Sequence, residues 1–202
     1  MKRFLCGWIA ALLIFSPSAP YAVETIQSVG SCKVLFSPDD RVADALISLI
    51  ASEKKSIKAA VYCLMHKGIA DALIEAHKRG VPVEVIVDPY SVKARSPLKR
   101  MHLAKLPVFV WNPPETIRQT KGGKEVKERK PLMHDKFCVL GDSCVWTGSF
   151  NFTFEATRRN RENVVVLENR QVAARYLAEF ERLKAQGCTP YFQYVSLAKA
   201  KP

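Results

Sequence analysis

Four polar residues in two closely spaced pairs form the part of this sequence that could carry out chemistry. His134 and Lys136 stand two positions apart at the start of an apolar run, and Ser149 and Asn151 are again two apart after a second run. Because side chains alternate between the faces of a strand, this spacing places the members of each pair on one face. An imidazole can attack phosphorus, while an ammonium and an amide can hold the non-bridging oxygens. The four side chains together therefore suit the hydrolysis of a phosphodiester.

The segments that must position these side chains alternate between two hydrophobic periodicities. Apolar runs predict strands at residues 32–36, 57–63, 83–87, 108–111, 136–140, 144–147 and 163–167. Helical spacing of apolar residues predicts helices at residues 39–54, 68–79, 97–105 and 170–185. This order predicts one α/β domain with a mixed, largely parallel β-sheet flanked by helices. Gly141, Asp142 and Ser143 mark the turn of a hairpin, and no internal repeat is visible, so the polar motif occurs once.

The stretch HDKFCVLGDSCVWTGSFN, residues 134–151, resembles the motif of the phospholipase D superfamily. In that family a His-x-Lys triplet precedes an aspartate, and a Gly-Ser pair followed closely by an asparagine comes next. The resemblance runs from about Val34 to Leu183 and extends to the family's small secreted bacterial endonucleases and to mitochondrial cardiolipin hydrolase. It implies the phospholipase D-like fold, a nucleophilic His134 and a phosphohistidine intermediate.

Two further acidic residues enter the expected catalytic set through this resemblance. The family aspartate would fall at Gly141, and the adjacent Asp142 could take its place. Glu162 resembles the family's carboxylate partner of the catalytic imidazole, although a surface residue at the start of a strand is an equally good interpretation. No group of His, Asp and Glu has the spacing of metal ligands, so we expect neither a metal nor another cofactor.

The charge of the chain indicates an anionic partner. Its formal net charge is +12 over 202 residues. Residues 112–131 form a basic stretch without a core pattern, which predicts a long loop that is either functional or disordered. Tyr90 and Trp111 could stack on unpaired bases or serve packing alone. We expect nucleic acid to be bound by Lys121, Lys124, Lys127, Arg129, Lys130, Arg158 and Arg159.

The first residues read as an export signal. Lys2 and Arg3 precede a short apolar run, and small Ala22 can end a cleavage site, which predicts a signal peptide over residues 1–22 and a domain over residues 23–202. Its removal lowers the net charge from +12 to +10. We expect a periplasmic or secreted protein without stable membrane association, and an uncleaved membrane anchor is the alternative. Cys32 and Cys188 could form a disulfide in an oxidising compartment.

Three functions compete for this sequence. The first is an endonuclease that cleaves DNA, RNA or both, and the second is a phospholipase D-type hydrolase acting on phospholipid head groups. The third is an inactive homologue that binds nucleic acid, for which Gly141 is the argument. Since cleavage needs both a nucleophile and an acid, and one motif supplies one imidazole, we expect a homodimer with a shared active site.

Overall fold

The computed structural model describes residues 30–113, 119–121, 124–126 and 131–199, so the expected signal segment lies outside the described residues. The strands in this part of the chain are β1 (Cys32–Ser37), β2 (Ile57–Val61), β3 (Val83–Val87), β4 (Val108–Trp111), β5 (Gln119–Lys121), β6 (Lys124–Val126), β7 (Lys136–Leu140), β8 (Cys144–Gly148), β9 (Glu162–Glu168) and β10 (Cys188–Pro190). The helices are α1 (Val42–Ser52), α2 (Lys67–Lys78), α3 (Leu98–Leu103), α4 (Phe154–Arg158), α5 (Arg170–Gly187), α6 (Tyr191–Lys199) and the short 3-10 helix η1 (Pro89–Ser91).

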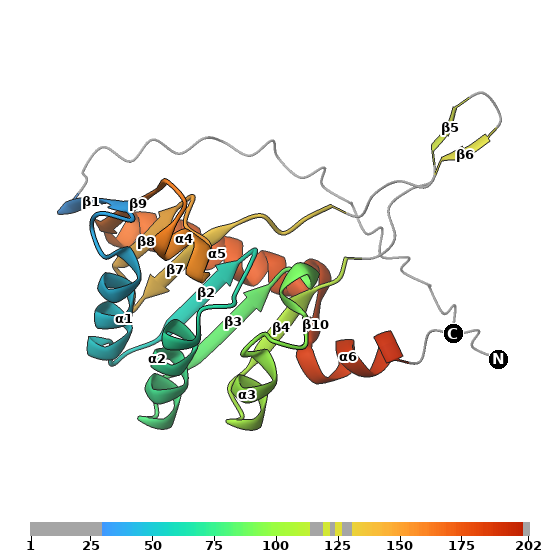
Figure 1. Cartoon of the computed structure of the whole chain (residues 1–202), viewed down its shortest axis with the longest axis horizontal. Coiled ribbons are helices and arrows are strands. Elements are labelled where there is room, and N and C mark those ends of the chain that lie inside the picture. The colour runs from blue at the N-terminus through green and yellow to red at the C-terminus, as the bar shows by residue number, and fades with distance from the viewer. Residues whose placement is uncertain (1–29, 114–118, 122–123, 127–130, 200–202) are drawn as a thin grey trace, which may run out of the picture.

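One mixed sheet organises these elements, with the strand order β1-β9-β8-β7-β2-β3-β4-β10 (Figure 1). The pairs β2–β3 and β3–β4 are parallel, because a helix crosses over between consecutive strands. The other neighbours in this sheet pair antiparallel. A mixed sheet flanked by helices is therefore confirmed, but its largely parallel character is wrong, since the tight β7–β8 turn and the chain-distant strands β1 and β10 add antiparallel partners.

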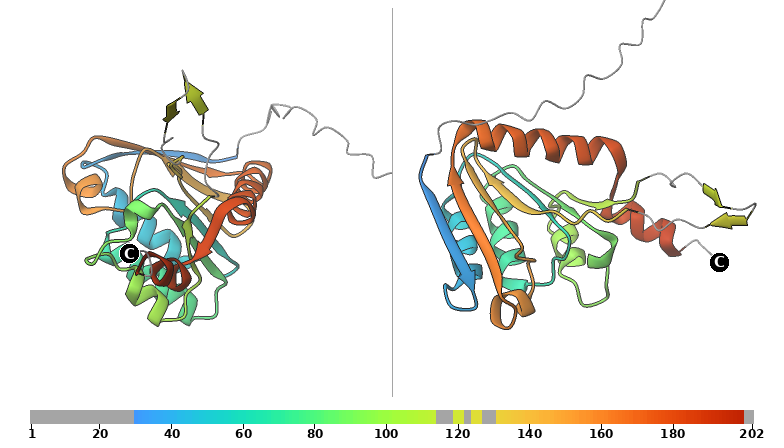
Figure 2. Two further views of the ribbon diagram at one scale, coloured as in Figure 1. Left: turned by 90° about the vertical axis from the view of Figure 1, so that its right-hand side faces the viewer. Right: turned by 90° about the horizontal axis from the view of Figure 1, so that it is seen from above.

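Helices cover both faces of the sheet. The long helix α5 lies against one face, while α1, α2 and α3 lie against the other (Figure 2). The central strand β7 contributes to both layers: Phe137 and Val139 belong to the cluster under α5, and Cys138 and Leu140 belong to the larger cluster on the opposite face. This explains why β7 is a continuous apolar run instead of an alternating one.

Six short elements of the described part of the chain were not predicted from the sequence: β5, β6, β10, η1, α4 and α6. The strand β10 and the helix α6 extend the fold beyond α5, and Tyr191 and Tyr194 of α6 pack against the larger core cluster. Within the stretch expected to be a loop, β5 and β6 pair with each other as a separate two-stranded sheet. Such short segments lack a periodic hydrophobic pattern long enough to be read from sequence.

The suggested disulfide between Cys32 and Cys188 is wrong. Cys32 lies on β1 and Cys188 on β10, at opposite edges of the eight-stranded sheet, and all the described cysteines are free. With roughly 4.8 Å between neighbouring strands, these edges lie on the order of 30 Å apart, far beyond the reach of a disulfide. Among the described residues, no helix has the length and apolar character needed to cross a membrane.

Candidate active site

The register of the sheet brings the expected catalytic residues together at one end of its central strands, where β2 and β8 end and β7 and β9 begin. Lys136 pairs with Val61, so the start of β7 lies beside the carboxyl end of β2. The antiparallel pairing of β8 with β7 and of β9 with β8 returns the end of β8 and the start of β9 to the same end of the sheet. The residues brought together in this way are His134, Lys136, Ser149, Asn151 and Glu162.

A buried ammonium lies next to an exposed imidazole at this end of the sheet. Lys136 is only 9% exposed, and its Nζ lies 3.1 Å from Nδ1 of the exposed His134. The same Nζ donates a hydrogen bond of 2.5 Å to the carbonyl oxygen of His134. Burial lowers the pKa of Lys136 below the ordinary lysine value, although the Asp135 and Glu162 carboxylates oppose this effect. A poorly solvated cation beside an accessible imidazole is a suitable binding place for an oxyanion.

The Glu162 carboxylate is held by the end of β8 and by the turn before β9. Ser149 Oγ donates to Glu162 Oε2 at 2.5 Å, and Asn160 Nδ2 donates to Glu162 Oε1 at 2.9 Å. The backbone N–H of Asn163 in turn donates to Ser149 Oγ at 3.1 Å. We expected the His134 imidazole to bond to Glu162. In the described part of the chain, Glu162 instead accepts from Ser149 and Asn160, and Nδ1 of His134 faces Lys136. Glu162 thus acts on the site through its charge near Lys136, and Ser149 positions Glu162.

Asn151 lines a groove shared with Tyr62 and has a buried side-chain oxygen that is unpaired among the described residues. Its Oδ1 is buried and has no hydrogen-bond partner in the described part of the chain. The segment around it is fixed to the end of β2, because Phe152 N donates to Cys63 O at 3.0 Å and Leu64 forms a bridge with Phe152. Buried polar groups are nearly always paired in folded proteins, so this oxygen stands out among the buried side-chain atoms that the structure describes.

Gly148 has a steric reason to precede Ser149. A Cβ atom at this position would lie 2.0 Å from the backbone oxygen of Asn163. Any larger residue would therefore push β9 away from β8 next to the Ser149–Glu162 hydrogen bond. The Gly-Ser pair of the motif consequently keeps the two strands close enough to fix the carboxylate.

Comparison with known proteins identifies the family. Residues 46–184 match the family described as cardiolipin synthase, PLD-like domain, which is more than half of the chain. The chain belongs to the phospholipase D-like family. It is therefore a hydrolase of phosphodiester bonds. The resemblance of the motif to the phospholipase D superfamily is confirmed.

Relatives of this phospholipase D-like protein carry different names. It is 28% identical over 173 residues to the mitochondrial cardiolipin hydrolase of Xenopus tropicalis, covering 85% of this chain and 75% of that protein. It is 30% identical over 161 residues to the phospholipase D of Rickettsia bellii, covering 79% and 71%. Among solved structures, the phospholipase D family member Nuc from Salmonella typhimurium has a TM-score of 0.66 and 29% identity over 80% of this chain and 97% of its own. NucT from Helicobacter pylori, at 21% identity and a TM-score of 0.67 over 80% and 99%, supports the fold alone.

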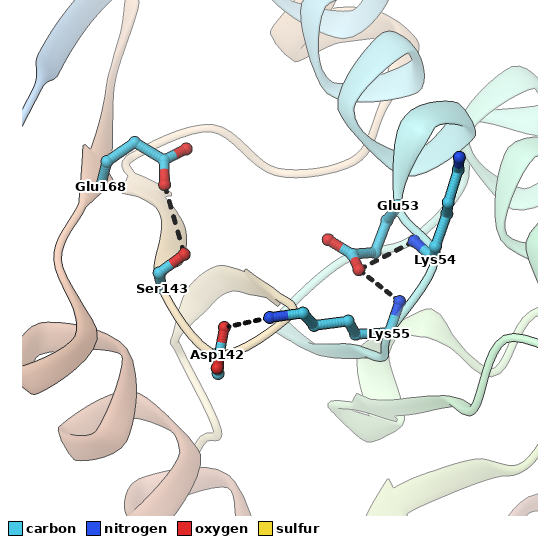
Figure 3. Close-up of polar contacts among 6 residues, drawn as sticks. All are labelled: Glu53, Lys54, Lys55, Asp142, Ser143 and Glu168. Carbon is cyan, nitrogen blue, oxygen red and sulfur yellow. Dashed lines mark hydrogen bonds and ion pairs between the residues drawn. The ribbon is translucent and has the colours of Figure 1, made fainter.

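Asp142 is the expected catalytic residue that the structure places apart from the phospholipase D-like site. It lies in the turn at the far end of β7, where its Oδ1 pairs with Lys55 Nζ at 3.0 Å (Figure 3). Gly141 precedes it with a φ of +63°, and a Cβ there would lie 3.3 Å from Glu53 Oε2. Asp142 therefore ties the β7–β8 turn to the segment after α1 and does not touch the reacting groups.

The basic residues expected to bind nucleic acid are only partly described. Arg158 and Arg159 are exposed at the end of α4, shortly after Asn151, and the Arg158 guanidinium lies 5.9 Å from the Phe154 ring centroid. Lys121 and Lys124 belong to the paired strands β5 and β6. Lys127, Arg129 and Lys130 lie outside the described residues. In the described part of the chain, no three His, Cys, Asp or Glu side chains gather closely enough to hold a metal ion.

The two aromatic residues expected to stack on bases lie in different environments, one buried and one exposed. Trp111 is buried, and its Nε1 donates to Pro131 O at 3.3 Å, so it serves packing. Tyr90 is 49% exposed and stacks on Tyr62, whose role the sequence analysis missed. A usable signal was present, because both tyrosines lie just beyond the carboxyl ends of parallel strands, where α/β sheets bind ligands.

Proposed function

We propose that this protein is an endonuclease that cleaves DNA, RNA or both through a phosphohistidine. The observation that carries the proposal is the exposed His134 imidazole beside the buried Lys136 ammonium. The motif's resemblance to small secreted bacterial endonucleases, the basic chain and the exposed Arg158 and Arg159 favour a nucleic acid over a lipid. The expected signal segment supports a periplasmic or secreted location.

In the proposed reaction, a neutral imidazole nitrogen of His134 attacks phosphorus. The phosphorus–oxygen ester bond breaks, and the departing oxygen takes a proton from a second, protonated imidazole. A water molecule then gives a proton to that second imidazole and attacks the phosphohistidine, which releases a phosphate monoester and restores His134. When substrate binds, the Lys136 ammonium leaves its contact with His134 Nδ1 and binds a non-bridging oxygen of the phosphate, which it holds through both steps.

The second imidazole is proposed to come from a second copy of the chain. Each chain carries one copy of the motif, and a twofold axis can bring two copies of a surface site together. His134 is exposed, so its imidazole is accessible to a partner as well as to substrate. The dimer would then contain one attacking and one proton-donating histidine in each catalytic cycle.

The function is tested with the purified protein and three labelled substrates in excess EDTA: DNA, RNA and phosphatidylcholine vesicles. We expect cleavage of at least one nucleic acid and no release of the phospholipid head group. Cleavage of the phospholipid alone would establish the second candidate, which the names of the cardiolipin hydrolase and phospholipase D relatives favour. Loss of activity in EDTA and its return on adding a divalent metal would contradict the proposed mechanism.

A further inference from the structure

A ladder of aromatic rings leads outward from the His134 imidazole. The Tyr62 ring centroid lies 4.6 Å from that of the imidazole. Tyr62 in turn stacks on Tyr90, with 5.1 Å between centroids and 11° between ring planes. Since Tyr90 remains 49% exposed, the ladder begins at the nucleophile and ends in solvent.

Hydrogen bonds fix this ladder relative to the nucleophile. The Asp88 side chain is 2% exposed, and its Oδ1 accepts from Tyr90 N at 2.8 Å while its Oδ2 accepts from Met133 N at 3.0 Å. Ser91 Oγ donates to Tyr62 O at 3.0 Å, so the Tyr62 backbone is also joined to the residue that follows Tyr90. A buried carboxylate thus couples the backbone of Tyr90 to that of Met133, the residue that precedes His134, which is the arrangement of a preorganised site.

The rings border a groove with cationic side chains. A groove of about 650 Å³ is lined by both tyrosines and by Lys93, Arg95 and Asn151, among others. The Lys93 Nζ lies 3.4 Å from the Tyr90 ring centroid. Because a lysine side chain is long and flexible, a planar group can displace it from the ring while the ammonium stays within reach of a neighbouring phosphate.

We propose that Tyr62, Tyr90 and Lys93 form a stacking subsite for the base of the nucleotide next to the scissile phosphate. The inference rests on the proposed nuclease function and names its substrate as single-stranded nucleic acid. In a duplex both faces of a base are covered by its neighbours, so only an unpaired base can turn onto the Tyr90 ring. The subsite tolerates any base, because every base has a π-face, and it selects strand state instead of sequence.

The test uses a single-stranded oligonucleotide with one cleavable phosphodiester among methylphosphonate linkages. A matched abasic strand has the same backbone but lacks the bases of both nucleotides that flank the cleavable linkage. We expect kcat/KM of the wild-type protein to favour the intact strand roughly tenfold, within the range found for one base–aromatic stack. Tyr90→Ala should abolish this ratio, whereas Tyr90→Phe, which keeps the ring, should preserve it. Phe192→Ala is the matched control, because Phe192 is a 63% exposed aromatic residue on α6 outside the groove.

A binding measurement separates the ring from the cation. In the His134→Asn background, binding is measured with a single strand that has natural phosphodiester linkages throughout. Tyr90→Ala should weaken this binding by a similar factor at every salt concentration, because stacking releases no counterions. Lys93→Ala should instead reduce the log–log salt slope by about 0.7.

The outcomes distinguish the two levels of inference. If Tyr90→Ala cleaves nucleic acid with the wild-type ratio between intact and abasic strands, the subsite is overturned while the nuclease function stands. If the wild-type protein cleaves neither strand and hydrolyses phosphatidylcholine, both proposals fall together.

Discussion

Lys136 carries its charge in a position that is largely closed to solvent, and this controls how the site responds to pH. The lysine interacts with His134 through both Nδ1 and the backbone oxygen, while Glu162 and Asp135 provide negative charge nearby. Because burial dominates, the pKa of Lys136 lies below the usual lysine value. The protonated form, which binds phosphate, is therefore lost at a lower pH than an exposed lysine would predict.

This gives a prediction for the alkaline limb of the pH profile. We expect kcat/KM to fall as the pH rises through the lowered pKa of Lys136, below the pH of about 10.4 at which a free lysine titrates. Bound phosphate favours the ammonium, so the corresponding limb of kcat should lie at a higher pH. Lys136→Arg remains charged throughout and should remove this limb even if its rate is lower. A kcat/KM limb no lower than that of an ordinary lysine would contradict the inferred role.

At the scale of elements, the β7–β8 hairpin carries the reacting residues at its open end and a structural ion pair at its turn. Its open end carries His134, Lys136 and Ser149, while its turn carries Gly141 and Asp142. The turn has local reasons for departing from the family pattern, because Gly141 has a positive φ and Glu53 lies where an aspartate carboxyl would extend. The missing family aspartate therefore provides no argument for an inactive protein.

Restoring the family aspartate should destabilise this protein without improving catalysis. Gly141→Asp forces a side chain into the left-handed region, which costs roughly 1–2 kcal/mol, and brings two carboxylates together. We expect a lower Tm and a kcat no higher than that of the wild type. Gly141→Asn, which adopts this backbone conformation at a similar cost but lacks the charge, should lose less stability. A Tm for Gly141→Asp equal to or above the wild-type value would show that Glu53 and the turn do not select glycine.

At the scale of the whole molecule, the reacting groups lie together at one end of the central strands of the sheet. The register of β7, β8 and β9 places these groups together, and the carboxyl ends of β2 and β3 supply the aromatic ladder beside them. One such site provides one imidazole, whereas the proposed reaction needs two. The two copies of His134 must therefore start the reaction in different protonation states, one neutral to attack and one charged to donate a proton.

A mixed dimer tests whether two chains share the reaction. His134→Asn should remove nearly all turnover from its own homodimer, and a heterodimer with the wild type should also be close to inactive because either the attacker or the acid is missing. A heterodimer of the wild type with Phe192→Ala, prepared in the same way, should retain full activity. Half of the wild-type activity in the first heterodimer, or a fully active monomer in sedimentation, would show that each subunit works alone.

The sequence by itself determined the local structure and the central chemistry. Residues 136–147 predict a hairpin because two apolar runs flank a Gly-Asp-Ser turn, and the helices α1, α2 and α5 follow from the spacing of their apolar residues. The same local spacing placed His134 beside Lys136 and Ser149 near Asn151. These features depend on neighbours a few residues away, so the sequence pattern contains them.

Tertiary structure alone decided the partners of these groups. Asp142 pairs with Lys55, 87 positions away, instead of entering the site, and Glu162 bonds to Ser149 and Asn160 instead of the imidazole. The contact of Tyr62 with His134 likewise depends on which strand lies next to β7 and in which register. Strand order and register are fixed by burying both sheet faces at once, which involves the whole chain and leaves no mark in any short stretch of sequence.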